Sequence, residues 1–288
     1  PGQNPFFPDT DEAAEQDCAY RRHYKKLANP PAFSRSYHMP DPLMAPGEYH
    51  NTTLFLDAAQ VIGLVKENKT TVNTLFAAFF SIALAEGYME TGAGREGIIR
   101  LEIPINMRQF YQTDTLRNFS LFLAPSITTS QAKLAFSEIL TILSDQMKEQ
   151  LESKYLEKQI SRNVGSELNW FISGIPMALK HVILKIVYKR LGETQFSGFL
   201  TNLGNIEISE DLKPFIERFG VVPAPSPVTK TNIAIHSYNG ALQITFGSVI
   251  ESPSLELRFI RHLKEKGLKP FRTESTKQIG RASCRERV

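Results

Sequence analysis

The chain contains few cysteines, and this excludes two kinds of small stabilised domain. Its only cysteines are Cys18 and Cys284, so neither a disulfide framework nor a zinc site built from cysteine clusters can form. Cys18 lies in the acidic stretch DTDEAAEQDC, whose charges disfavour a reactive thiolate. We therefore interpret Cys18 as an ordinary free thiol rather than a nucleophile.

The sequence also lacks a long apolar run and a strong charge bias. No uninterrupted apolar stretch approaches the ~20 residues that cross a bilayer, so no membrane span is predicted. The formal net charge is +3, and the last ten residues contribute three arginines and one glutamate to it. The remainder is nearly neutral, which removes any composition-level argument for binding nucleic acid.

Both ends of the 288-residue chain differ in character from its middle. Residues 279–288 (IGRASCRERV) read like a translated sequencing adapter, so we expect a truncated reading frame with a non-native tail and leave this tail out of the fold. Residues 1–48 contain eight prolines and a basic run at 21–26. This composition predicts a proline-rich connector with one short helix and a solvated basic face.

Residues 49–278 alternate between strand and helix patterns. The apolar residues Ile99, Leu101, Ile103 and Ile105 have the period of two that is typical of a half-buried strand. Similar patterns predict further strands at His50–Leu56, from Leu116–Phe119 onward, at Phe196–Gly204, Thr231–Tyr238 and Ala241–Val249, with Val221–Pro225 left open. Helices are predicted at Asp57–Lys66, after a Thr71 cap, at Phe136–Leu151, within the apolar stretch Met177–Leu191, and from a Ser252 cap to Gly267.

A hairpin is the most specific local prediction. Asn239 and Gly240 separate two alternating runs, and this dipeptide favours the two-residue turn that joins antiparallel strands. Strands and helices alternate without an internal repeat. The predicted fold class is therefore α/β, a mixed sheet flanked by helices.

Three short blocks carry a family resemblance. They are Pro104–Arg108 (PINMR), Leu116–Phe119 (LRNF) and Phe196–Ile206 (FSGFLTNLGNI). In this order they resemble the chloramphenicol acetyltransferase-like superfamily, and within it the bacterial alcohol acetyltransferases, relatives of peptide-synthetase condensation domains. The resemblance implies that residues 49–278 form the C-terminal half-domain of a two-half-domain fold and one wall of the acyl-donor tunnel.

The histidine motif of that superfamily is absent. The resemblance implies a general base from a His-His-x-x-x-Asp-Gly motif, because an imidazole with a near-neutral pKa can take the proton of an attacking alcohol. No two of the six histidines are adjacent, and none is followed four positions later by aspartate; they are His23, His38, His50, His181, His236 and His262. We expect the N-terminal half to be missing and the fragment to be inactive. His236 is weighed as a base but interpreted as a strand residue.

Thr201 and Asn202 are the predicted catalytic contributors. A hydroxyl or amide donor near the thioester carbonyl would stabilise the oxyanion formed during acyl transfer. The alternative is that Asn202 only stabilises the turn before Gly204. Four residues are assigned to structure or to the substrate tunnel: Asn106, Arg108, Asn118 and Gly204. For Arg108 we favour a structural role, holding a sheet end through a carboxylate, over orienting the missing motif's aspartate.

The resemblance implies a function for the parent protein. This function is acyl-CoA-dependent O-acyl transfer, with acetyl-CoA or another acyl-CoA as cosubstrate and an alcohol as acceptor, in the cytoplasm. No permanently bound cofactor or metal is expected, because no phosphate-binding loop or metal-spaced cluster occurs. Two alternatives remain open: a condensation domain that uses carrier-protein-bound acyl groups, and a non-catalytic docking member.

Overall fold

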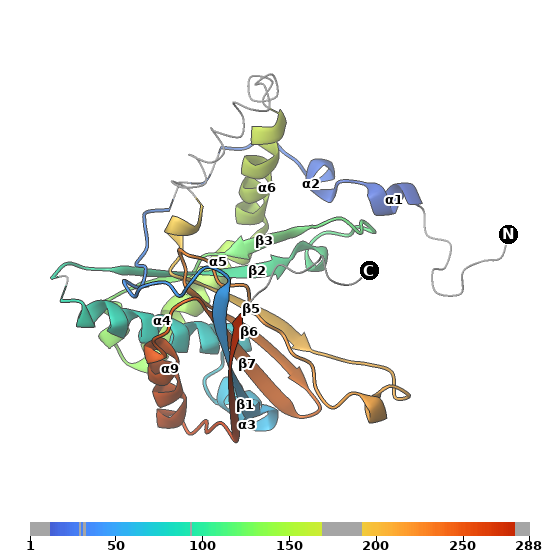
Figure 1. Cartoon of the computed structure of the whole chain (residues 1–288). Helices are drawn as coiled ribbons and strands as arrows, with labels where there is room; N and C mark the ends of the chain where they lie inside the picture. Colours follow the sequence, from blue (N-terminus) through green and yellow to red (C-terminus); the bar gives the residue numbers. More distant parts are fainter. Residues whose placement is uncertain (1–11, 29, 31–32, 93, 169–191, 280–288) are drawn as a thin grey trace.

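A single mixed β-sheet organises the molecule in the computed structural model, which describes residues 12–28, 30, 33–92, 94–168 and 192–279 (Figure 1). Within these residues the sheet has eight strands in the order β3-β2-β5-β6-β7-β1-β8, and β4 pairs with β2. The strands are β1 Glu48–Asp57, β2 Ile98–Asn106, β3 Ser120–Leu123, β4 Ser126–Thr128, β5 Gly198–Asn205, β6 Thr231–Tyr238, β7 Ala241–Ser248 and β8 Arg272–Ile279.

The centre of the sheet is parallel and its flanks are antiparallel. β5 pairs in parallel with β2 on one side and with β6 on the other, while the remaining pairs are antiparallel. Parallel neighbours require long crossover connections. The connection from β2 to β5 contains α5 and α6, whereas the connection from β5 to β6 is the irregular stretch 206–230. The predicted α/β class and the mixed sheet flanked by helices are confirmed.

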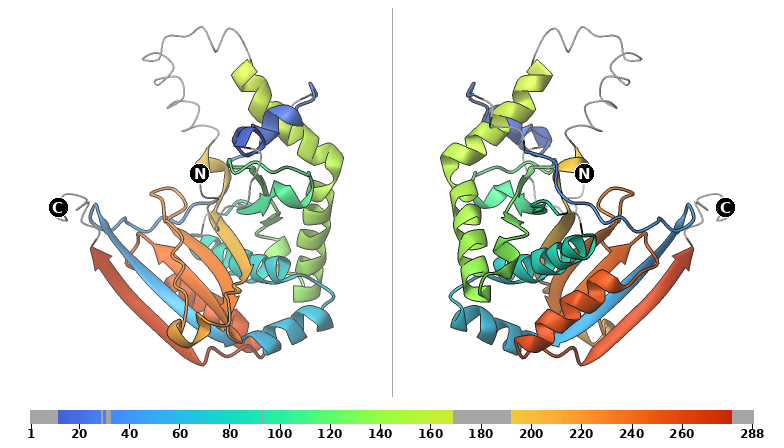
Figure 2. Two further views of the ribbon diagram at one scale, coloured as in Figure 1. Left: turned by 90° about the vertical axis from the view of Figure 1, so that its right-hand side faces the viewer. Right: turned by 90° about the vertical axis from the view of Figure 1, so that its left-hand side faces the viewer.

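The helices lie mainly on one face of the sheet. They are α1 Glu12–Gln16, α2 Ala19–Arg22, α3 Ala58–Glu67, α4 Val72–Glu90, α5 Phe136–Leu151, α6 Ser153–Leu168 and α9 Ser254–Glu265. Figure 2 shows α4 and α9 across the same face, in the right-hand view. Phe259 of α9 packs there against Phe76 and Phe79 of α4 and against Phe246 of β7.

Helix α4 is apolar on nearly every side because other elements surround it. Its residues from Thr74 to Ala85 are all buried between the sheet, α5 and α9. By length and composition it is long and apolar enough to cross a membrane, yet 67% of the apolar window is buried inside the protein. Such burial is typical of the core helix of a globular domain.

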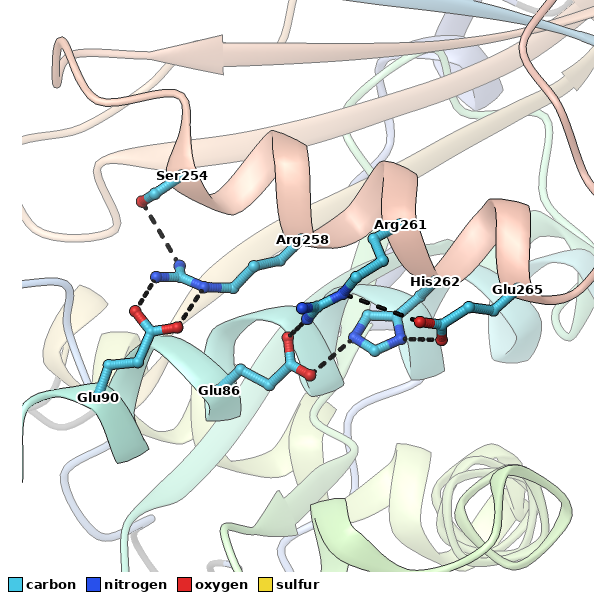
Figure 3. Close-up of polar contacts among 7 residues, drawn as sticks. All are labelled: Glu86, Glu90, Ser254, Arg258, Arg261, His262 and Glu265. Carbon is cyan, nitrogen blue, oxygen red and sulfur yellow. Dashed lines mark hydrogen bonds and ion pairs between the residues drawn. The ribbon is translucent and has the colours of Figure 1, made fainter.

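A polar clasp joins the outer sides of α4 and α9 (Figure 3). Arg258 is paired with Glu90 through two of its nitrogens, and Arg261 is paired with Glu86. His262 Nε2 lies 3.1 Å from a Glu86 carboxylate oxygen, and its Nδ1 lies 3.1 Å from Glu265. The clasp therefore engages both carboxylates at the C-terminal end of α4.

Residues 206–230 form a covering segment on the opposite sheet face, which the left-hand view of Figure 2 presents. Buried side chains of β6 hold it by hydrogen bonds to its backbone. Asn232 donates to the Ala224 carbonyl at 2.8 Å, and Tyr238 donates to the Ile216 carbonyl at 2.9 Å. The open prediction of a strand at Val221–Pro225 is therefore wrong, because this part of the segment is irregular and bonds to side chains rather than to a ladder.

The connector folds partly against α6 and partly against the sheet. It contains two short helices, α1 and α2, rather than the single one expected. Ala19 of α2 joins Leu156 and Ile160 of α6 in a second apolar cluster. Further along, the Tyr37 amide donates to the Ile98 carbonyl at 2.8 Å, so the extended part of the connector lies beside the start of β2.

Several predicted boundaries agree with the structure and others move. Asp57 and Thr71 cap α3 and α4 by accepting hydrogen bonds from the Gln60 and Thr74 amides. The cap of α9 is Pro253, not Ser252, whose hydroxyl is 3.4 Å from the Ser254 amide. The sequence analysis did not predict three elements, β4, α6 and β8. Strand β3 begins one residue after the predicted start Leu116–Phe119. Two predicted stretches, Met177–Leu191 and residues 280–288, lie outside the described residues.

Candidate functional site

Most of the predicted site residues lie toward the carboxyl ends of β2 and β5, in two groups with separate hydrogen-bond partners. Leu101 and Glu102 pair in parallel with Gly198 and Phe199, so both strands run toward the same edge. Ligands of α/β proteins commonly bind outside the carboxyl ends of parallel strands. We therefore treat this edge, together with the first turn of α4, as the candidate site.

Asn202 connects β5 to α4. Its side-chain oxygen accepts a hydrogen bond from the Gly204 amide at 2.9 Å, and its amide nitrogen donates to Asn73 Oδ1 at 2.8 Å. The register between β5 and β6 shifts between Asn202 and Asn205, and Gly204 takes a φ of 74° within this bulge. A positive φ favours glycine, so the bulge explains the glycine at position 204, and the hydrogen bond from its amide explains the asparagine at position 202.

Asn73 is a site residue that the sequence analysis missed. It lies in the first turn of α4, two positions after the Thr71 cap, and is half-buried. Within the described chain, neither its amide nitrogen nor the Thr201 hydroxyl has a hydrogen-bond partner. A polar side chain opening an otherwise apolar helix was the available signal. Asn73 and Thr201 thus offer unused polar groups next to Asn202.

Arg108 bonds to the loop that follows the end of β2. Its guanidinium donates to the Thr115 carbonyl at 2.9 Å and to the Arg117 carbonyl at 2.7 Å. It therefore holds the loop that leads to β3, and its assignment to structure or to the substrate tunnel stays a prediction. Its partners are backbone carbonyls rather than the carboxylate that was expected, because the loop turns its own carbonyl groups toward the guanidinium.

Asn106 and Asn118 stabilise the two ends of the same loop. Asn106 accepts a hydrogen bond from the Arg108 amide at 3.1 Å and begins the short 3-10 helix η1, Met107–Gln109. Asn118 accepts one from the Ser120 hydroxyl at 2.8 Å, just as β3 begins. The structure gives both residues local contacts, and a role in a substrate tunnel stays a prediction.

His236 is a buried strand residue. It is 1% exposed, and its Nε2 lies 3.2 Å from the Phe219 carbonyl of the covering segment. Burial lowers the pKa of this imidazole. Three other histidines have partners of their own: His23 lies against Tyr111, His50 pairs with Glu256, and His262 pairs with Glu86 and Glu265. His181 lies outside the described residues.

The polar side chains next to Asn202 are neutral. Throughout the described residues, no group of three or more His, Cys, Asp or Glu side chains is arranged to hold a metal ion. The chemistry available at the edge is hydrogen bonding by amides and a hydroxyl. Such groups can bind a carbonyl oxygen or a developing oxyanion.

Comparisons with known proteins identify relatives by fold alone. No family model matches the chain, and no curated protein matches its sequence. The wax ester synthase/diacylglycerol acyltransferase from Marinobacter aquaeolei VT8 is similar in structure, with a TM-score of 0.50 and 14% identity over 81% of this chain and 53% of that one. The epimerization domain from the third module of tyrocidine synthetase B gives a TM-score of 0.52 at 15% identity, over 80% and 51% of the two chains.

A nonribosomal peptide synthetase also contains the fold, with a TM-score of 0.51 and 11% identity over 82% of this chain and 23% of that one. The chain thus spans about half the length of the first two relatives. Identities this low establish a shared fold and leave the reaction to be argued from the residues.

Proposed function

We propose that this chain, which has the fold of the chloramphenicol acetyltransferase-like superfamily, is part of an acyl-CoA-dependent O-acyltransferase. The acyl group would move from a thioester to an alcohol in the cytoplasm, with acyl-CoA as a cosubstrate and no bound cofactor. The polar edge formed by Asn73, Thr201 and Asn202 supports this proposal more than any other feature. It combines unused hydrogen-bonding groups with a rigid position at the ends of parallel strands.

The edge would act on the charge that develops during transfer. When the alcohol oxygen attacks the thioester carbonyl, the carbonyl oxygen becomes an oxyanion, and the carbon–sulfur bond breaks as that charge collapses. A preorganised donor at the oxyanion contributes about 2.7–4 kcal/mol of transition-state stabilisation. Asn202 is preorganised by its two hydrogen bonds, and its second amide hydrogen is the donor we assign to the oxyanion.

The proton of the alcohol needs a base that these residues do not supply. Amides and a threonine hydroxyl do not accept a proton near neutral pH, and the buried His236 is enclosed by the covering segment. We assign the base to a histidine of the superfamily motif in a preceding half-domain. The chain as given is therefore proposed to be inactive.

A second candidate is a condensation-type reaction. The likeness to the epimerization domain of a peptide synthetase favours it, since the TM-score of 0.52 is at least as high as that of the wax ester synthase. In that case the acyl donor would be carried by a carrier protein and the acceptor would be an amine. A docking member without catalysis is the third possibility.

The test uses the product of the gene that carries this chain, together with any upstream segment. It compares acetyl-CoA plus an alcohol with an acylated carrier protein plus an amine. Ester formation from acetyl-CoA supports the proposal, reaction only with the carrier supports the second candidate, and no reaction with either supports docking.

Variants of the polar edge test the assigned roles. Asn202→Ala and Asn73→Ala are expected to lower kcat about 100-fold and about tenfold, because the first removes the donor and the second only its anchor. Asn68→Ala is a matched control, since Asn68 donates to the Leu64 carbonyl at the end of α3. An Asn202→Ala enzyme with unchanged kcat would refute the oxyanion assignment.

A further inference from the structure

A polar cleft lies at the other end of α4, away from the candidate edge. Its volume is about 620 Å³, and its walls include Arg35 and Tyr37 of the connector and Tyr88 and Arg95 around the end of α4. Since α4 rises about 1.5 Å per residue, Tyr88 and Asn73 are about 22 Å apart along the helix. The cleft is therefore separate from the polar edge.

Hydrogen bonds to neighbouring elements fix the walls of the cleft. The Ser36 amide donates to the Thr194 carbonyl at 3.1 Å, and the Tyr37 amide donates to the Ile98 carbonyl at 2.8 Å. On the opposite wall, the Tyr88 hydroxyl donates to the Arg95 carbonyl at 3.2 Å. A cavity with walls fixed in this way is largely formed before any ligand enters it.

Two unpaired guanidinium groups line the cleft. Arg35 and Arg95 are both exposed, and neither side chain has a hydrogen bond or ion pair with any residue that the structure describes. Glu90 is held by Arg258, as Figure 3 shows. Glu96 also lines the cleft, accepts from the Ser130 hydroxyl and keeps its single negative charge against the two arginines. The cleft therefore presents an excess of positive charge with hydrogen-bond donors in fork geometry.

Two tyrosine rings line the same cleft as these arginines. The rings of Tyr37 and Tyr88 meet edge to face, with centroids 5.0 Å apart. Burial raises the pKa of the Tyr37 phenol to about 12, so this phenol stays uncharged well into the alkaline range. Aromatic faces and guanidinium planes both stack on flat rings.

We propose that this cleft binds a phosphate ester that carries an aromatic base, the chemistry of a nucleotide. Arg35 and Arg95 bind the phosphate groups, and the tyrosine pair contacts the base. Guanidinium groups suit phosphate because they donate two parallel hydrogen bonds. The residues that line this cleft are distinct from those at the polar edge.

Calorimetric titration of the 288-residue chain tests the proposal. ADP, pyrophosphate and adenosine are the probes, and ADP is expected to bind at least tenfold more tightly than either of the others because it alone carries both groups. Arg35→Gln and Arg95→Gln are each expected to weaken ADP binding by about tenfold. Tyr88→Leu should weaken ADP and leave pyrophosphate unchanged.

The controls separate binding from folding and from general charge. Arg117→Gln removes an exposed arginine outside the cleft and should leave ADP affinity unchanged, and each variant should unfold at the wild-type temperature. Competition between coenzyme A and ADP shows which nucleotide the cleft prefers. If coenzyme A displaces ADP at a concentration well below that of ADP, the preferred ligand is the nucleotide end of coenzyme A. If coenzyme A must reach the ADP concentration to displace it, the ligand is a free nucleotide. Absence of ADP binding at ~1 mM, or full affinity in the Arg35→Gln and Arg95→Gln variants, would overturn the proposal.

Discussion

Replacing Arg100 by methionine tests how the connector is held on the sheet. Arg100 is only 6% exposed and has no ion pair with any residue that the structure describes, and burial lowers the pKa of its guanidinium. It donates to the Ser34 carbonyl at 2.7 Å, to the Gln195 carbonyl at 3.1 Å and to the Ser36 hydroxyl at 3.3 Å. Its guanidinium also lies 4.7 Å from the ring centre of Phe33. One side chain thus joins β2, the connector and the segment before β5.

The expected loss of stability follows from which acceptors lose their donor. The Gln195 carbonyl keeps a second donor in the Ser36 hydroxyl, whereas Arg100 is the donor for the Ser34 carbonyl. Ser34 is an exposed residue, so water can replace the lost donor at its carbonyl. The loss therefore comes mainly from the hydrogen bonds of the charged guanidinium, each of which contributes about 1.5–3 kcal/mol. Methionine removes the desolvation cost of the buried cation, which offsets part of this loss. We expect a net destabilisation of about 2–4 kcal/mol.

Two measurements report on Arg100→Met. Urea unfolding followed by circular dichroism gives the change in unfolding free energy, and limited trypsin digestion measures how often the chain opens at Arg35, which lies beside the bonded connector residues. The digestion rate at Arg35 should rise at least about tenfold. Arg272→Met is the control, because Arg272 is exposed and paired with Glu274, and it should change stability by less than about 1 kcal/mol. Unfolding free energies equal within ~0.5 kcal/mol for wild type and Arg100→Met would refute the reasoning.

Three further perturbations test other parts of the fold. Gly247→Ala should destabilise the protein by at least about 2 kcal/mol in urea unfolding, because the new Cβ would lie 2.1 Å from a carbonyl oxygen of the covering segment. In the control Gly63→Ala the new Cβ meets nothing within 4 Å, and the change should stabilise α3 by about 0.5–1 kcal/mol. Because burial lowers the pKa of folded His236, the unfolded chain takes up a proton first as pH falls below 6.5, and the free energy of unfolding should decrease there. In a His236→Gln variant, the melting temperature should depend less on pH between pH 7.5 and 5. Arg258→Met should lower the melting temperature by only a few degrees, since its partner carboxylate is exposed to solvent; no change at all would show that the clasp adds nothing.

Local chemistry explains which parts of the fold could be predicted from the sequence. Asn239 and Gly240 have φ values of 50° and 78°, so the turn between β6 and β7 depends on two adjacent residues alone. The caps at Asp57 and Thr71 bond to amides three positions later. β8, in contrast, reads RTESTKQI and lies at the sheet edge, where the described side chains are mostly exposed and no alternation is required.

The site could be predicted only where its contacts are local. Asn202 and Gly204 were found because their hydrogen bond spans two positions and forms a recognisable turn. Asn73 escaped because its partner Asn202 lies 129 positions away, a pairing that only the packing of α4 on β5 creates. The acceptors of Arg108 also depend on the path of a loop rather than on residue types.

The position of β1 in the sheet has a consequence for biosynthesis. β1 is the first strand of the described chain to leave the ribosome, yet its two ladder partners are β7 and β8, so His50 must wait for Ser248 and Lys277. Contacts between such distant residues slow folding, because a long loop must close before they form. During this delay the apolar side of β1, with Leu54 and Leu56, has no native partner strand and is open to aggregation. The ladder between β1 and β7 can therefore form only after the β6–β7 hairpin has emerged.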